Sequence, residues 1–188
     1  INEIPESESL GNLYAMTTFL LGMVPLEHEY KLMGMAPYAP EKGADLVYAD
    51  LARLLEFPDA KSLSWRRAGG CPPTYYSYEF LKKLYELRRF DWICAGLQRF
   101  TERLLVDWAR RCIAHTGVRR LALSGGVFMN VKANKLLLEM PEVESLYVYP
   151  SCGDESNAFG AAYRVHAERR LAEKRPVDVE PLGPVYFG

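Results

Sequence analysis

The sequence has no long run of apolar residues, and no segment reaches the roughly 18 apolar residues that a membrane helix requires. Its net charge is −1, so charge offers no reason to expect nucleic acid or an anionic membrane as a partner. The start, INEIPESESL, is polar and acidic and does not read as a signal peptide. These absences predict a cytoplasmic protein that binds neither a membrane nor nucleic acid.

The four cysteines and three histidines are too scattered to predict a metal centre or a disulfide framework by themselves. No two cysteines share a CxxC spacing, and the histidines show neither HxxH nor HxxxH spacing. This use of cysteine fits a reducing compartment. Cys152 also has no evident activating partner in the sequence around it.

Two strand–turn–helix units between residues 121 and 162 are the most informative feature that is present. A strand at 121–123 leads into the turn Ser-Gly-Gly at 124–126, and a strand at 146–149 leads into the turn at 150–154. Such turns present backbone N–H groups and helix N-termini at one edge of a sheet, which indicates a phosphate or nucleotide site. Tight structural turns are the alternative, because short glycine motifs are not specific.

Five residues are candidates for that site. Gly125 and Gly126 permit a positive φ and a close approach of a ligand to the backbone. Asn130 is placed to bond a ribose hydroxyl or a base edge, or else it only caps the next helix. Asp154 is either a helix cap, or a metal ligand or phosphate-side acid. Lys31, among apolar neighbours, is either a snorkelling side chain or a cation for a phosphate.

Helical periodicity dominates the chain up to residue 115 and returns after each predicted strand. Helices are predicted over 9–24, 29–36, 44–56, 77–89, 90–115, 130–140 and 154–173. Residues 57–76 are irregular and predict a hairpin or an excursion from the core, whereas the last helix is expected to close the core. We therefore predict an α/β fold with parallel strands flanked by helices over 1–173, and a linker over 174–188.

Several motifs occur together in a fixed order along the chain. They are SLGNLY at 9–14 with Thr17, EYKLMGMAPY at 29–38, Gln98 with Glu102, LSGGVFMN at 123–130 with Asn134, and PSCGD at 150–154 ahead of GAA at 160–162. In this order they resemble the O-carbamoyltransferase family of nodulation-factor and antibiotic biosynthesis. The order and spacing make the resemblance more specific than any single motif.

The resemblance implies an actin-like ATPase/sugar-kinase fold of the ribonuclease H-like type, related to the enzyme that makes threonylcarbamoyl-adenosine in tRNA. The chain would be the C-terminal half of that domain, and thus an incomplete half of the fold. By the same mapping Gly125, Gly126 and Asn130 would contact the adenosine, and Lys31 the phosphate side. Asp154 would be one ligand of a divalent metal, Fe2+, whose partner histidines are not in this chain.

The activity implied is the transfer of a carbamoyl group from carbamoyl-adenylate to a hydroxyl of a small-molecule acceptor such as a sugar or an antibiotic. An adenylate-forming domain of the same protein, to which the linker would lead, makes that adenylate from ATP and carbamoyl phosphate. This chain alone is expected to be inactive, and a homodimer stays open. Two alternatives remain: another actin-like ATPase or kinase, and a non-catalytic nucleotide-binding or interaction module.

Overall fold

The computed structural model describes residues 2–178 and residue 183, and the chain divides into two compact units. Unit 1 comprises the chain up to Leu121 together with Asn130–Leu146. Unit 2 comprises Ala122–Met129 and the chain from Tyr147 onward. Most of the predicted linker at 174–188 lies outside the described residues.

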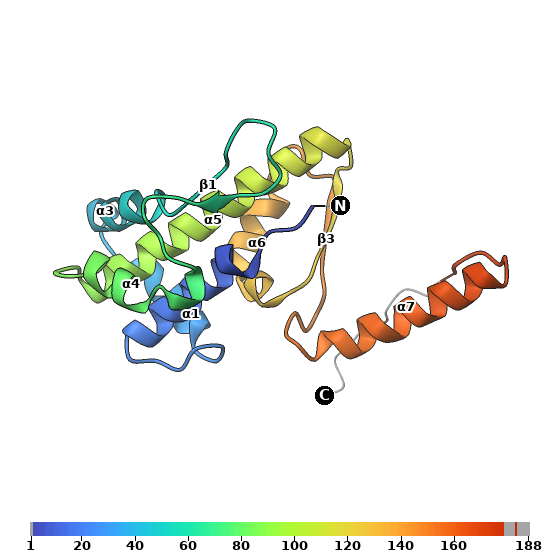
Figure 1. Cartoon of the computed structure of the whole chain (residues 1–188), viewed down its shortest axis with the longest axis horizontal. Helices are drawn as coiled ribbons and strands as arrows, with labels where there is room; N and C mark the ends of the chain where they lie inside the picture. The colour runs from blue at the N-terminus through green and yellow to red at the C-terminus, as the bar shows by residue number, and fades with distance from the viewer. Residues whose placement is uncertain (1, 179–182, 184–188) are drawn as a thin grey trace. The chain divides into compact units, whose positions relative to one another are not determined.

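Unit 1 is built mainly of helices, several of which are labelled in Figure 1. Its α-helices are α1 (Leu10–Leu20), α2 (Glu29–Met35), α3 (Glu41–Leu51), α4 (Tyr78–Leu84), α5 (Phe90–Thr116) and α6 (Val131–Leu138). Short 3-10 turns are η1 (Glu6–Glu8), η2 (Ala36–Tyr38) and η3 (Thr74–Tyr76). The predicted helices of this unit are all present, with ends that differ from the predicted ends by a few residues.

Local sequence signals explain where two of these helices begin and end. The Ser9 hydroxyl accepts the N–H of Asn12 at 3.2 Å, so it satisfies a backbone donor that the first turn of α1 leaves unpaired. Gly117 ends α5 in the left-handed conformation, with φ 71°, which glycine adopts without steric cost.

Helix α5 is the element against which α2, α3, α6 and η2 pack. The approach of α3 is close because Gly96 of α5 has no side chain. A Cβ built there would lie 2.5 Å from the Cβ of Val47 and 2.9 Å from the backbone nitrogen of Tyr48. Small residues continue this contact, since Ala36, Ala44 and Ala95 form a buried cluster.

The strands are short and form two separate pairs among the described residues. β1 (Leu55–Glu56) and β2 (Arg66–Arg67) are antiparallel, with Leu55 opposite Arg67, so residues 57–76 include the return strand of a hairpin. β3 (Arg120–Leu123) and β4 (Ser145–Val148) form the second pair, a small parallel sheet joined by α6. The fold is therefore α/β, with a sheet much smaller than the helical part.

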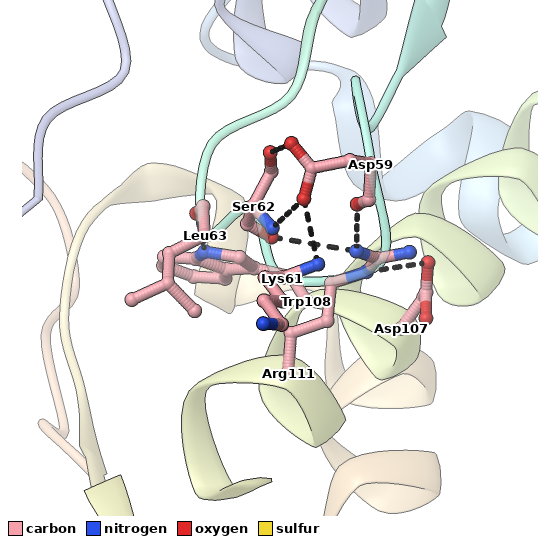
Figure 2. A network of polar contacts seen from close by, with 7 residues as sticks. All are labelled: Asp59, Lys61, Ser62, Leu63, Asp107, Trp108 and Arg111. Carbon is pink, nitrogen blue, oxygen red and sulfur yellow. Dashed lines mark hydrogen bonds and ion pairs between the residues drawn. The ribbon is translucent and has the colours of Figure 1, made fainter. Parts of the chain in front are cut away.

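The loop between β1 and β2 is held against α5 by polar contacts (Figure 2). The Arg111 guanidinium donates to the carbonyl of Asp59 at 2.7 Å and lies 4.0 Å from the ring centroid of Phe57. The Asp59 carboxylate accepts the N–H groups of Lys61 and Ser62 at 2.7 and 2.9 Å. Hydrogen bonds from Ser62 and Lys61 hold the pKa of Asp59 below its ordinary value. This irregular segment is thus an ordered part of unit 1.

Unit 2 contains the ends of β3 and β4, the 3-10 turn η4 (Gly126–Met129) and α7 (Ser156–Ala172). The sequence predicts that this last helix closes the core with a face of small residues at 158–162. None of the described residues of α7 is buried, so the other elements of unit 2 do not cover the small-residue face of this helix. No helix in the described part of the chain is long and apolar enough to cross a membrane.

The contact at Gly96 predicts that Gly96→Ala destabilises unit 1. Overpacking costs about 1–3 kcal/mol, whereas alanine in place of glycine in a helix interior stabilises by about 1 kcal/mol. The Tyr48 nitrogen belongs to the backbone and cannot move without shifting α3, so we expect a net loss of about 1 kcal/mol. Thermal unfolding measures it. Gly34→Ala in α2 is the matched control, because nothing lies within 4 Å of its added Cβ. Equal melting temperatures for the two variants would contradict the close α3–α5 contact.

Candidate functional site

The turns that follow β3 and β4 lie beside each other within unit 2. The N–H of Tyr149 donates to the carbonyl of Leu123 at 3.1 Å, which aligns the ends of the two strands. Beyond this pair, the N–H of Gly125 donates to the sulfur of Cys152, and the Cys152 thiol donates to the Tyr149 carbonyl at 2.8 Å. Both turns therefore meet at one edge of the sheet, as the strand pattern predicts.

The first of these turns, the glycine turn (Ser124–Gly126), is exposed. Gly125 has a φ of +106°, a conformation that strains residues with a side chain. Gly126 does not have a positive φ, and nothing lies within 4 Å of a Cβ built at either glycine. No contact among the described residues therefore requires a glycine at position 126, and its missing side chain leaves room for a ligand to approach the backbone.

The glycine turn does not open a helix directly, which differs from the predicted strand–turn–helix unit. It leads into η4, where the N–H of Phe128 donates to the Gly125 carbonyl at 2.9 Å, and α6 begins only at Val131. Three residues of η4 therefore lie between Gly126 and Asn130. Sequence periodicity does not detect a turn this short.

The second turn, the acidic turn (Pro150–Glu155), carries the predicted metal ligand. Asp154 is exposed, and no hydrogen bond or ion pair joins its carboxylate to another described residue. It does not cap α7, because that helix follows Glu155 and has no side-chain cap. Glu155 accepts a hydrogen bond from the Ser151 hydroxyl, which lowers the pKa of Glu155. Glu155 therefore has a structural partner, whereas Asp154 is available to a ligand.

Asn130 belongs to unit 1, where its side chain has two roles. Its Oδ1 accepts the N–H of Ala133 at 3.1 Å, so Asn130 is the N-cap of α6. The same oxygen accepts from Nε2 of Gln98 at 2.9 Å, while its Nδ2 donates to Oε1 of Gln98 at 2.8 Å. The two amides thus form a reciprocal pair that joins α5 to the start of α6.

Gln98 uses its full hydrogen-bonding capacity in this arrangement. It is 3% exposed. Its Nε2 also donates to the Glu102 carboxylate at 2.7 Å, and its Oε1 also accepts from the Tyr14 hydroxyl at 3.2 Å. Burial raises the pKa of Tyr14 well above its ordinary value, and nearby acidic groups add to the shift, so this hydroxyl stays protonated and can donate. We call Tyr14, Gln98, Glu102 and Asn130 the amide network.

The sequence singled out part of this network but not its function. Gln98 and Glu102 were motif matches four residues apart on one predicted helix, a spacing that brings side chains together. Asn130 was a candidate ligand residue, and Tyr14 stood within a motif without a role. No local pattern pairs residues 14, 98 and 130, because the contacts span 84 and 32 positions of the chain.

Lys31 is half-buried on α2 in unit 1. Its Nζ lies 5.7 Å from the ring centroid of Tyr30, a contact worth about 0.5–1 kcal/mol at an exposed site. No ion pair joins its ammonium to a carboxylate in the part of the chain that the structure describes. The charge is therefore available to an anionic ligand.

Burial disfavours the thiolate form of the cysteines. All four are free thiols. Burial raises the pKa of each one, and it raises the pKa of Cys94 to about 12 with help from the Asp91 charge. Residues 2–178 and 183 contain no group of three or more His, Cys, Asp or Glu side chains able to hold a metal. Asp154 is therefore at most one ligand of an incomplete set.

Comparison of the sequence with known proteins identifies its family. The profile described as "Carbamoyltransferase N-terminus" matches residues 1–163. The chain belongs to the carbamoyltransferase family. The match contains the glycine turn, the acidic turn and the whole amide network.

The relatives include nodulation proteins. The chain is 34% identical to nodulation protein NolNO of Sinorhizobium fredii over 98% of its own length, and 32% identical to NolO of Bradyrhizobium diazoefficiens over 98%. An uncharacterized protein of Synechocystis is 31% identical over 99% of the chain. The chain spans 26% of the length of NolNO and 32% of each of the other two.

Proposed function

We propose that this chain is part of an O-carbamoyltransferase and forms the C-terminal half of its actin-like ATPase domain. An adenylate-forming domain of the same protein would make carbamoyl-adenylate from ATP and carbamoyl phosphate. The observation that carries the proposal is the family match over residues 1–163 together with an open glycine turn inside it. A small molecule with a hydroxyl group, such as a sugar or an antibiotic, is the proposed acceptor.

In the proposed transfer an acceptor oxygen attacks the carbamoyl carbon. A new C–O bond forms, the bond from that carbon to the adenylate oxygen breaks, and AMP leaves with the electron pair while the hydroxyl proton is lost. The protein must bind the adenosine, neutralise the phosphate and hold the carbamoyl group in position. We assign adenosine contacts to Gly125, Gly126 and Asn130, and the phosphate contact to Lys31.

Three properties of these residues support the assignment. The glycine turn is open at both Cα atoms, which suits the approach of a flat or phosphorylated ligand to the backbone. Asn130 keeps a fixed amide, as the amide network shows. The Lys31 ammonium pairs with no described carboxylate, so it is free to neutralise a phosphate.

For the metal, we propose that Asp154 is one ligand of Fe2+. An exposed carboxylate without a structural partner fits this role, but the described residues contain no group of three or more His, Cys, Asp or Glu side chains able to hold the ion. The rest of the ligand set would have to come from sequence outside this chain. No step of the transfer is therefore assigned to the metal.

The proposed activity predicts that the intact protein carrying this chain releases pyrophosphate from ATP only when carbamoyl phosphate is present. Adenylate formation displaces pyrophosphate from the α-phosphate, whereas a kinase would transfer the γ-phosphate and release ADP. Coupled pyrophosphate and ADP assays separate the two. Pyrophosphate release that does not depend on carbamoyl phosphate, or ADP as the nucleotide product, would overturn the proposed activity in favour of another ATPase or kinase.

The open space at Gly126 predicts that Gly126→Ala leaves the fold intact but weakens nucleotide binding by at least about tenfold, since a methyl group would occupy the path of the ligand to the backbone. Isothermal titration of the intact protein with AMP measures the affinity, and thermal unfolding checks the fold. Gly160→Ala is the matched control, because its added Cβ also meets nothing within 4 Å but lies on α7. Unchanged AMP affinity in Gly126→Ala would remove Gly126 from the site.

The assignment of Asp154 predicts that Asp154→Ala lowers the iron content of the purified intact protein from stoichiometric to near zero. Loss of one anionic ligand from a small ligand set removes most of the affinity. Elemental analysis gives the content directly. Glu155→Ala is the control, since Glu155 bonds to Ser151. If iron stayed stoichiometric in Asp154→Ala, Asp154 would not be a ligand.

A further inference from the structure

The amide network fixes which way the Asn130 amide faces. Oδ1 of Asn130 must face the N–H of Ala133, because only an oxygen can accept that bond. Nε2 of Gln98 must face Glu102, because a carboxylate only accepts hydrogen bonds. These two requirements come from opposite ends of the network and agree on one orientation, in which each amide oxygen faces the amide nitrogen of the other residue.

The same contacts limit what Asn130 can offer to a ligand. Its Oδ1 already accepts two hydrogen bonds, at 2.9 and 3.1 Å, so both lone pairs are used. Its Nδ2 carries two hydrogens, and one of them is donated to Gln98 at 2.8 Å. One N–H of Asn130 therefore remains for a ligand, and no acceptor remains.

Gln98 has no such spare capacity. Its oxygen accepts from Tyr14 and Asn130, and its nitrogen donates to Asn130 and Glu102. Because it is 3% exposed and fully bonded, Gln98 cannot itself contact a ligand without breaking the network. Its effect on a ligand has to pass through Asn130.

We infer that Gln98 is a positioning residue that makes Asn130 a hydrogen-bond donor only, so that Asn130 recognises an acceptor atom of the nucleotide. The inference rests on the proposed function. The acceptors proposed are N3 or N7 of adenine, or the 2′ or 3′ hydroxyl oxygen of the ribose. The exocyclic amino group of adenine is excluded, because it would need an acceptor on Asn130.

The test compares AMP with analogues that each lack one acceptor: 7-deaza, 3-deaza, 2′-deoxy and 3′-deoxy AMP. The intact protein is titrated with each, and the ratio of its Kd to that of AMP is the readout. The wild-type protein is expected to bind one analogue about three- to tenfold more weakly, which is the range for one neutral hydrogen bond. Asn130→Ala should bring that ratio to about one.

Gln98→Met keeps the length and burial of the side chain but removes its hydrogen bonds. We expect this variant to bring the Kd ratio of the discriminated analogue to about one, although residue 98 touches no ligand. The double variant Gln98→Met with Asn130→Ala should show the same ratio as either single variant. Gln98→Glu is a second variant that keeps the oxygen facing Asn130 but loses both donated bonds, and it should weaken the discrimination as well. Thermal unfolding shows which variants are folded.

Thr101→Val is the matched control on the same helix. Thr101 is 1% exposed and its hydroxyl has no hydrogen-bond partner among the described residues, so this change perturbs α5 without touching the amide network. Its Kd ratios should equal those of the wild-type protein. A loss of discrimination in Thr101→Val would show a general effect of altering α5 and would overturn the role of Gln98.

Other outcomes separate this inference from the proposed function. If folded Gln98→Met or Gln98→Glu weakens AMP and all analogues equally, or leaves every ratio unchanged, the positioning role is wrong while nucleotide binding stands. If the wild-type protein binds AMP but discriminates against none of the four analogues, the donor contact from Asn130 is wrong. If it binds no AMP and shows no carbamoyl phosphate-dependent pyrophosphate release, the proposed function fails, and the inference fails with it.

Discussion

The close packing of α3 on α5 at Gly96 is the constraint on which the rest of unit 1 depends. A side chain at this position would meet both the side chain and the backbone of α3, so only glycine lets the two helices approach this far. The contact holds the middle of α5 in the core of the unit. Gln98 follows two residues later on the same helix, and its burial there forces every polar atom of its amide to find a partner. The amide network is thus a consequence of how α5 is packed.

The amide network joins Gln98 of α5 to Asn130 at the start of α6, and both residues lie within the range that the family profile matches. Asn130 caps α6 and stands directly after η4, which itself follows the glycine turn. In unit 2, the Cys152 thiol joins the glycine turn to the acidic turn through Gly125. The thiol therefore acts as a hydrogen-bonding group between two loops. Two of the ligand candidates are therefore held by buried neighbours: Asn130 by Gln98, and Gly125 by Cys152.

The sequence predicted well what depends on local chemistry. Ser9 and Gly117 are residue types that cap helices, and the structure shows Ser9 at the start of α1 and Gly117 at the end of α5 in these roles. The two strands at the glycine and acidic turns were also predicted, because short apolar runs that end in turn-forming residues are typical of strands. The reciprocal pair between Gln98 and Asn130 was not, since it depends on tertiary packing across 32 positions. The exposure of α7 was not predicted for a similar reason. Its small residues indicate a face that could pack against another element, but the sequence does not show whether unit 2 contains such an element.

The central proposal is that the intact protein carrying this chain binds the nucleotide at the segment from the glycine turn to Asn130. The most direct measurement is a crystal structure of the intact protein with bound AMP. The account predicts density for the adenosine along the backbone of Gly125 and Gly126, with one adenosine acceptor within hydrogen-bonding distance of Nδ2 of Asn130. Adenosine bound elsewhere, with the glycine turn free of ligand, would contradict it.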